Sequence, residues 1–176
     1  MQRTILLVAV FALAATCVSA QVKSETPAGQ RLPARPKTFV GDYAKVIDVG
    51  AERQLETKLA ALRKRAGIEF VVVTLETTGA EDIFDYSLAA ARTWKLARGA
   101  GDKGGILLML AVRDRKWRVQ LTDSLRVDLP ESVLRVHGDR MEEVYRQGKM
   151  GAGVNLFVDG LIAHLAERRG LKNLPD

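Results

Sequence analysis

Cysteine is almost absent from this chain of 176 residues, since Cys17 is the only one and lies in an apolar stretch near the N-terminus. If that stretch is removed, the remaining chain can form no disulfide, carries no thiol nucleophile and offers no cysteine ligand to a metal. Its stability must then come from packing. The length that remains suits one domain with one sizeable core.

Histidine is also scarce, because the sequence contains only His137 and His164. Neither belongs to a histidine-rich zinc pattern, and no G-x-S-x-G turn is present to supply a catalytic serine. We therefore expect both histidines to be packed against neighbours or exposed on the surface.

No long apolar run follows the first twenty residues, so we expect no transmembrane anchor in the mature chain. Residues 1–20 form a different kind of segment, in which Arg3 precedes an apolar run from Ile5 to Val18 and small residues end at Ala20. This pattern is typical of an export signal cleaved after Ala20. A lipoprotein cleaved before Cys17 is the alternative. Either way, we expect a periplasmic or secreted protein.

The charge balance is mildly basic, with 27 Lys and Arg against 21 Asp and Glu and a net charge of +6. Acidic residues are interspersed with the basic ones, so the chain lacks the basic stripe that nucleic-acid binding requires. We expect no nucleic-acid partner. An envelope protein or an anionic ligand remains open as the partner.

Apolar periodicity predicts a single domain over residues 39–170, preceded by a flexible, proline-containing leader at 21–38 and followed by a tail at 171–176. In chain order the predicted elements are a helix at 51–66, a strand at 68–75, a helix at 81–97, strands at 105–112 and 117–121, and helices at 129–147 and 151–168. The two later strands are close enough to form an antiparallel hairpin. This order predicts a three-layer α/β/α sandwich around a central mixed sheet.

The segment Gly99 to Gly104 reads G-x-G-x-x-G, which is the pattern of dinucleotide-binding loops. Such a loop follows a strand and opens a helix, so that the pyrophosphate rests on the helix N-terminus. Here the predicted helix comes first and the strand second, and nucleotide binding is not expected. A helix end and a sharp entry into the strand account for the glycines, but they do not account for Asp102.

Aspartates gather at one predicted end of the hairpin. If the turn centres near Asp114, antiparallel pairing matches residues whose numbers sum to about 228, within two. Asp102, Asp123 and Arg126 then lie at one end of the sheet, and Asp114 lies about 25 Å away as a turn residue. Asp42, just before the first helix, is a further candidate. Carboxylates of this kind bind calcium or magnesium, so Asp102, Asp123 and Asp42 are candidate metal ligands, unless they cap helices, close turns or pair with Arg126.

Several motifs in order resemble those of a known family. They are Val40–Ile47, Gly67–Thr74, Asp82–Ser87 and Gly101–Leu108, followed by Asp114-Arg115 in the turn. Together they resemble the TPM domain, a family named for a thylakoid lumen phosphatase, a photosystem repair protein and a nematode receptor regulator, over about residues 39 to 166. The resemblance implies an α/β/α fold, residence outside the cytoplasm or in a lumen, calcium binding in some members and acid phosphatase activity in others.

The chain departs from the family pattern after the second hairpin strand, where relatives have a leucine and a glutamate in a glycine-rich turn. This chain has Leu125 followed by Arg126. A positive charge beside Asp102 would repel a cation and could replace it as a salt-bridge partner. We therefore predict an extracytoplasmic interaction module with at most weak catalysis. The alternative is a calcium- or other divalent-metal-dependent acid phosphatase acting on phosphomonoesters, in which Arg126 binds the substrate phosphate.

Overall fold

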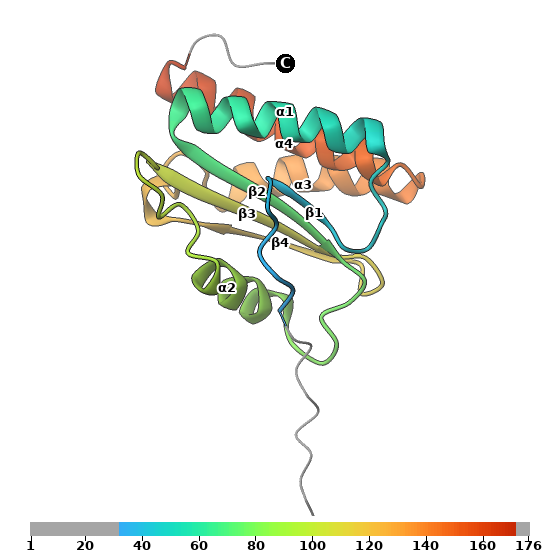
Figure 1. Cartoon of the computed structure of the whole chain (residues 1–176). Helices are drawn as coiled ribbons and strands as arrows, with labels where there is room; N and C mark the ends of the chain where they lie inside the picture. Colours follow the sequence, from blue (N-terminus) through green and yellow to red (C-terminus); the bar gives the residue numbers. More distant parts are fainter. Residues whose placement is uncertain (1–31, 172–176) are drawn as a thin grey trace, which may run out of the picture.

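The computed structural model describes residues 32–171, which form one four-stranded sheet between two helical layers (Figure 1). Strands β1, β2 and β3 are parallel, and β4 is antiparallel to β3, so the sheet is mixed and contains the predicted hairpin. Helices α1, α3 and α4 cover one face, whereas α2 covers the other. The predicted three-layer α/β/α sandwich is confirmed. The bounds are β1 (Val40–Asp42), α1 (Val49–Ala66), β2 (Ile68–Leu75), α2 (Ile83–Thr93), β3 (Gly104–Ala111), β4 (Lys116–Leu121), a 3-10 turn (Asp123–Leu125), α3 (Glu131–Arg146) and α4 (Met150–Arg169).

The predicted export signal, including Cys17, lies outside the described residues, as do residues 172–176. Within the described part, no helix has the length and apolar character needed to cross a membrane.

The larger core lies between the sheet and the layer of α1, α3 and α4. Leu55, Leu59 and Leu62 recur at helical spacing on α1, and all three are fully buried against the sheet. Helix α4 buries Phe157 and Leu161 in the same layer. Each such side chain stabilises the fold by about 1.5–3 kcal/mol relative to an exposed position.

A smaller core lies on the opposite face, under α2. Tyr86, Ala90 and Trp94 pack there against Val71 and Val73 of β2. Strand β2 is therefore buried on both faces, as its continuous apolar run predicts.

Helix α2 is shorter than the predicted span of 81–97. Asp82 caps its N-terminus by accepting a hydrogen bond from the Phe84 backbone N–H at 2.8 Å, so the helix begins at residue 83. Its last helical residue is followed by Trp94, and Lys95 and Ala97 then adopt left-handed backbone. These conformations end the helix well before the glycine segment.

Two features of the sheet differ in detail from the sequence expectation. Strand β1 was not predicted, because its three residues are too few to show an alternating pattern. In the hairpin, Leu110 lies opposite Trp117, whereas a sum of 228 would place it opposite Arg118. The observed register is therefore one position from the centre of the predicted range and lies within it.

The chain leaves β1 and β2 toward opposite faces of the sheet, because α1 and α2 lie on different sides. The connections β1–α1–β2 and β2–α2–β3 each lead to the next strand on the same side of the sheet. Because their helices lie on opposite faces, the two connections have opposite handedness. The C-terminal ends of the three parallel strands share one edge of the sheet with the β3–β4 turn, and this edge is the usual position of ligand sites in α/β proteins.

The described part of the leader, residues 32–38, packs against the domain. Leu32 contacts the core under α2. The Arg35 guanidinium donates to the Trp94 carbonyl and to the Glu69 carboxylate, both at 2.6 Å. This segment therefore ties the end of α2 to the start of β2.

Candidate functional site

The candidate carboxylates lie at two opposite edges of the sheet. Asp42 ends β1 and pairs with Thr74, near the C-terminal end of β2. Asp102 precedes β3 at the other edge, where the Lys103 backbone N–H donates to the Gly67 carbonyl. The seven steps along the chain from Gly67 to Thr74 span roughly 23 Å at the usual rise of a strand. Asp42 and Asp102 therefore lie too far apart to bind the same ion, because β1 runs parallel to β2 and ends at the far edge.

The Asp42 carboxylate organises the loop between β1 and α1. It accepts hydrogen bonds from the backbone N–H groups of Val46 and Ile47 at 3.1 and 2.9 Å, and from the Thr74 hydroxyl. Both of its oxygens are thus used by protein donors. These bonds hold the loop against the end of β1, just before the Asp48 cap at which α1 begins.

Asp114 lies in the β3–β4 turn, as predicted, at the same edge as Asp42. Its carboxylate accepts from the Thr78 backbone N–H and the Thr77 hydroxyl, both at 2.8 Å, and from the Thr78 hydroxyl at 3.3 Å. The Thr78 N–H, followed by the Thr77 hydroxyl, lowers the pKa of this carboxyl below its usual value of 3.8. Asp114 therefore fastens the hairpin turn to the loop that follows β2.

Asp102 pairs with Arg63 of α1 instead of Arg126. The Arg63 Nε lies 3.1 Å from one carboxylate oxygen, and its Nη2 lies 3.2 Å from the other, so the pair is bidentate. The Gly99 backbone N–H donates to the same carboxylate at 2.7 Å. The Asp102 side chain is only 3% exposed. The predicted contact with Arg126 is wrong because Arg63, near the end of α1, occupies both oxygens of the Asp102 carboxylate.

Arg126 instead pairs with Asp123, three residues earlier, with 2.9 Å between Nε and the carboxylate. Both side chains are exposed, Asp123 by 97% and Arg126 by 63%. They do lie at the same end of the sheet as Asp102, because the Ser124 hydroxyl donates to the Lys103 carbonyl at 2.9 Å. The predicted shared edge is thus present, while the predicted pairing across it is not.

Sequence reasoning missed Glu69, which lies within the apolar strand β2 and is only 2% exposed. Its carboxylate accepts from the Ala97 backbone N–H at 2.7 Å and forms ion pairs with Arg35 and Arg63. An acidic residue inside an apolar strand was the signal, since a buried charge requires a partner. Together these residues form an ionic network at the N-terminal edge of the sheet, in which the carboxylates are buried and the guanidiniums are partly exposed.

The glycine segment is a loop that contributes Asp102 and the Gly99 backbone N–H to this network. It follows α2 and precedes β3, which is the reverse of the order in a dinucleotide-binding loop. Gly101 has a φ of +86°, which glycine adopts without strain. A Cβ on Gly104 would lie 2.8 Å from the Leu125 side chain, so this glycine also allows close packing.

Among residues 32–171, no three His, Cys, Asp or Glu side chains lie close enough together to hold a metal ion. The two histidines lie between α3 and α4, where His137 contacts Gly160 and His164 bonds to the Asp128 carbonyl at 3.0 Å. Burial, followed by the charges of Arg140 and His164, lowers the pKa of His137 below 6.5. Both are packing residues, as expected.

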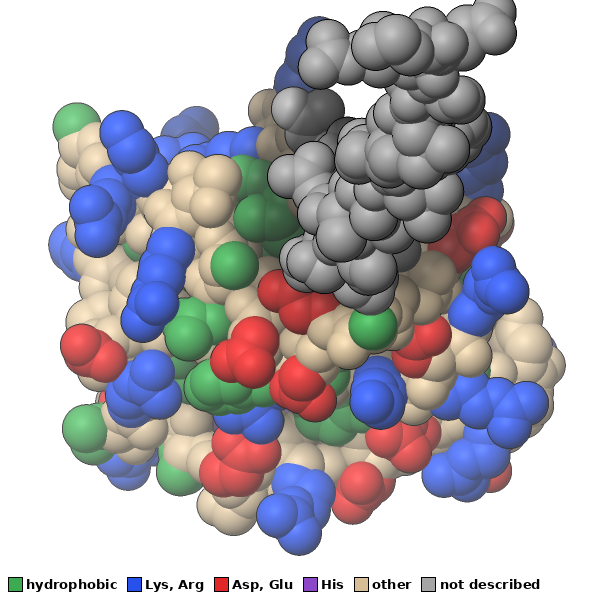
Figure 2. Space-filling view, turned by 90° about the horizontal axis from the view of Figure 1, so that it is seen from below, with side chains coloured by type: hydrophobic (Ala, Val, Ile, Leu, Met, Phe, Trp, Pro, Cys, Tyr) green, Lys and Arg blue, Asp and Glu red, His purple; other side chains and the backbone are tan. Residues whose placement is uncertain are grey.

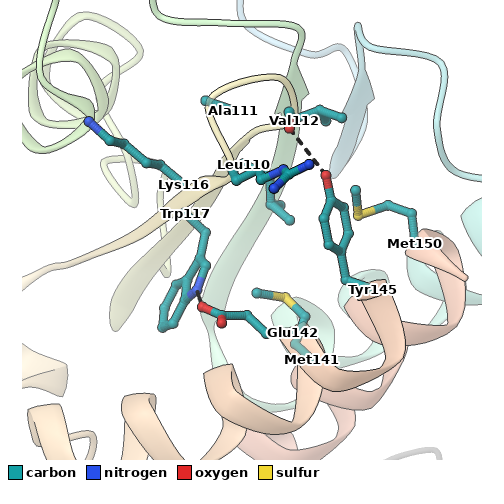
Figure 3. Close-up of a pocket in the computed structure, with 10 residues that line it drawn as sticks. Leu110, Ala111, Val112, Lys116, Trp117, Met141, Glu142, Tyr145 and Met150 are labelled. Atoms are coloured by element: carbon teal, nitrogen blue, oxygen red, sulfur yellow. Dashed lines mark hydrogen bonds between the residues drawn. The ribbon is translucent and has the colours of Figure 1, made fainter. Parts of the chain in front are cut away.

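A groove opens at the C-terminal edge of the sheet, between the β3–β4 turn and the junction of α3 and α4 (Figure 3). Its main part has a volume of about 720 Å³, and a smaller apolar recess of about 40 Å³ continues from it. Within it, the Trp117 indole N–H donates to Glu142 at 2.7 Å, and the Tyr145 hydroxyl donates to the Val112 carbonyl at 3.2 Å. Sequence analysis did not identify this groove, because its walls come from segments far apart in the chain.

On the face that carries α2, acidic and basic side chains are interspersed, as in the sequence (Figure 2). The groove is a concave feature with a partly apolar lining, and it lies at the edge where α/β folds usually bind ligands.

Comparison with known proteins identifies the family. The family model described as the TPM domain matches residues 40–164, which is most of the chain. The chain belongs to the TPM domain family. The four motifs noted in the sequence fall within the matched residues, and the predicted resemblance is confirmed. No curated protein matches the chain.

Solved structures support the TPM assignment at the level of fold. The chain is similar to the N-terminal domain of a protein from P. gingivalis, with 28% identity and a TM-score of 0.68, covering 78% of this chain and 88% of that one. It is also similar to the BA42 protein of Bizionia argentinensis, with 19% identity, a TM-score of 0.57 and coverage of 74% and 89%. The N-terminal domain of the cg2496 protein of Corynebacterium glutamicum has 13% identity, a TM-score of 0.56 and coverage of 73% and 80%.

Proposed function

We propose that this TPM domain is exported and acts outside the cytoplasm as an interaction module, with at most weak catalysis. One observation carries the proposal: two of the three predicted metal ligands are already bonded by donors of the protein itself. Asp42 accepts from the backbone of the loop that precedes α1, and Asp102 accepts from Arg63. Each of them has a structural role that requires no ligand.

The predicted calcium site fits these residues poorly. A cation bound by Asp102 would lie next to the Arg63 guanidinium, which is 3.1 Å from the carboxylate, and the two positive charges would repel each other. Asp42 lies at the other edge of the sheet and cannot complete the site. Asp123 is free to turn toward solvent, but one exposed carboxylate paired with Arg126 is a weak cation ligand.

A metal-dependent acid phosphatase remains the second candidate because of one feature. Asp123 and Arg126 are adjacent and exposed, so a phosphomonoester could reach both of them. Arg126 would then bind the phosphate as a bidentate donor.

A calcium titration followed by thermal melting tests the proposal, since a ligand that binds the folded state raises the Tm by mass action. We expect a shift below about 1 °C at millimolar calcium, because the Asp102 carboxylate is held by Arg63. Arg63→Ala should increase the calcium response by freeing that carboxylate. A wild-type shift of several degrees that Asp102→Asn removes would contradict the proposal.

Hydrolysis of p-nitrophenyl phosphate provides the second measurement. Divalent-metal-dependent turnover that is lost in both Asp123→Asn and Arg126→Gln would favour the phosphatase. Turnover that survives both substitutions would indicate a contaminating enzyme or a different site, and Arg113→Gln serves as the matched surface control.

A further inference from the structure

We propose that the groove between the β3–β4 turn and the α3–α4 junction binds an extended segment of a partner protein in which an apolar side chain stands next to a carboxylate. This inference rests on the proposed function as an interaction module, and it names the surface and the chemistry of the partner.

The floor of the groove is apolar and adaptable. Met141 and Met150 line it from α3 and α4, and Val46 and Val112 line it from the loops after β1 and β3. Methionine side chains are flexible and fit apolar groups of different shapes. The main volume of about 720 Å³ is within the range of roughly 300–1,000 Å³ typical of sites for small ligands. The groove can therefore enclose apolar side chains of a short segment.

The rim carries a positive charge that the domain does not neutralise. Glu142 accepts from Trp117 and lies 3.7 Å from Arg146, which also pairs with Glu143 at 2.6 Å. Arg115, by contrast, is exposed and lines the groove, and its side chain has no hydrogen bond or ion pair within residues 32–171. A planar guanidinium in this position is suited to bind a carboxylate by two parallel hydrogen bonds.

The turn that carries Arg115 is held rigidly. Asp114, its neighbour, accepts three hydrogen bonds from Thr77 and Thr78. On the groove side, the Tyr145 hydroxyl donates to the Val112 carbonyl at the start of the turn. Arg115 itself has a φ of +53°, which is uncommon for a residue other than glycine. The Arg115 backbone N–H donates to the Val112 carbonyl and closes the hairpin turn, in which a left-handed residue is common, and this anchoring lowers the entropy lost on binding.

The mixed charges around the groove suit a peptide better than a uniformly anionic membrane surface. Its lining alternates the guanidiniums of Arg115 and Arg146 with the carboxylate of Glu142. An extended peptide can present one carboxylate to Arg115 and a backbone N–H group to Glu142. The concave shape also suits a narrow segment better than a flat one.

The test uses a fluorescein-labelled, seven-residue peptide of alternating leucine and glutamate, with binding measured by fluorescence anisotropy at low salt. Two control peptides replace glutamate by lysine or leucine by serine, and phosphatidylcholine vesicles with phosphatidylglycerol test membrane binding. Arg115→Asn is the main variant, because asparagine tolerates left-handed backbone. Arg113→Asn is its matched control, since Arg113 is exposed in the same turn but does not line the groove.

We expect the leucine–glutamate peptide to bind, and both control peptides to bind at least tenfold more weakly. Arg115→Asn should weaken peptide binding about tenfold or more without changing the Tm, whereas Arg113→Asn should change the peptide affinity less than about twofold. Binding should also change the fluorescence of Trp117, which lines the groove. These results together would support the proposal.

Absence of peptide binding at millimolar concentration, or equal binding by wild type and Arg115→Asn, would overturn the groove proposal. Tighter binding to the anionic vesicles than to the peptide would replace it with a membrane-binding surface. None of these results changes the calcium response or phosphate hydrolysis. A negative peptide-binding result would therefore contradict only the groove proposal. Metal-dependent turnover would instead contradict the proposed function as an interaction module.

Discussion

The Thr78 backbone N–H donates to the Asp114 carboxylate at 2.8 Å, and this contact joins the β3–β4 turn to the loop after β2. Sequence spacing identifies Asp114 as a turn residue, but the contact gives it a wider role. It fixes the segment that presents Arg115 to the groove, and it places a charged acceptor where two neighbouring loops meet.

Asp114→Asn should lower the Tm by about 3 °C or more, because the amide loses a charge-assisted acceptor for the Thr78 N–H and the Thr77 hydroxyl. Since hydrogen bonds lower the pKa of this carboxyl in the folded state, its stabilising contribution is present above pH 3.8 and declines as the pH falls through the lowered value. The difference in Tm between wild type and variant should therefore shrink below about pH 4. A constant difference from pH 7 to pH 3 would contradict this account.

His137 should make the domain less stable in weak acid. Burial and the nearby Arg140 and His164 lower its pKa in the folded state, so the unfolded chain takes up a proton first as the pH falls below 6.5. Stability should therefore rise between pH 5 and about pH 7, and His137→Gln should reduce that slope. Urea unfolding at pH 5 and pH 7.5 measures both. An unchanged slope in the variant would mean that His137 is not the responsible group.

Gly160 is required for the contact between α3 and α4. A Cβ at this position would lie 2.1 Å from Nδ1 of His137, so Gly160→Ala should destabilise the domain by about 1–3 kcal/mol although alanine favours the helix. Adding His137→Ala should recover part of that loss in a double-mutant cycle. Ala163→Gly, at an exposed position of α4, measures helix propensity alone. Additive effects of the first two substitutions would disprove the contact.

Arg63 should contribute more to stability than its neighbour Arg65. Removing it leaves Asp102 and Glu69, which are 3% and 2% exposed, without one of their cationic partners. Loss of a partner from a fully buried pair costs about 3–5 kcal/mol, and we expect about 2 kcal/mol here because Arg63 is itself 39% exposed. Arg65→Ala, on the exposed side of α1, should change stability by less than about 0.5 kcal/mol. Equal effects in urea unfolding would contradict the proposed network.

Some of the architecture was determined by the sequence alone, because the interactions involved are local. Leu55, Leu59 and Leu62 define the buried stripe of α1 by their spacing, and Asp48 and Gly67 define its ends through caps that involve nearby backbone. The continuous apolar run of β2 likewise predicts a strand buried on both faces. The alternation of such segments is sufficient to predict the α/β/α layers.

The candidate site was decided only by the tertiary structure. Asp102 has its charged partner 39 residues earlier in the chain, on a helix whose end reaches the glycine loop because α1 crosses from one edge of the sheet to the other. Asp42 is separated from Asp102 because β1 pairs in parallel with β2, and three residues carry too little pattern to predict that pairing. The groove beside Arg115 likewise exists only where α3, α4 and the hairpin turn meet. Contacts between distant segments depend on how whole helices and strands pack. For that reason the spacing of residues along the chain does not predict them.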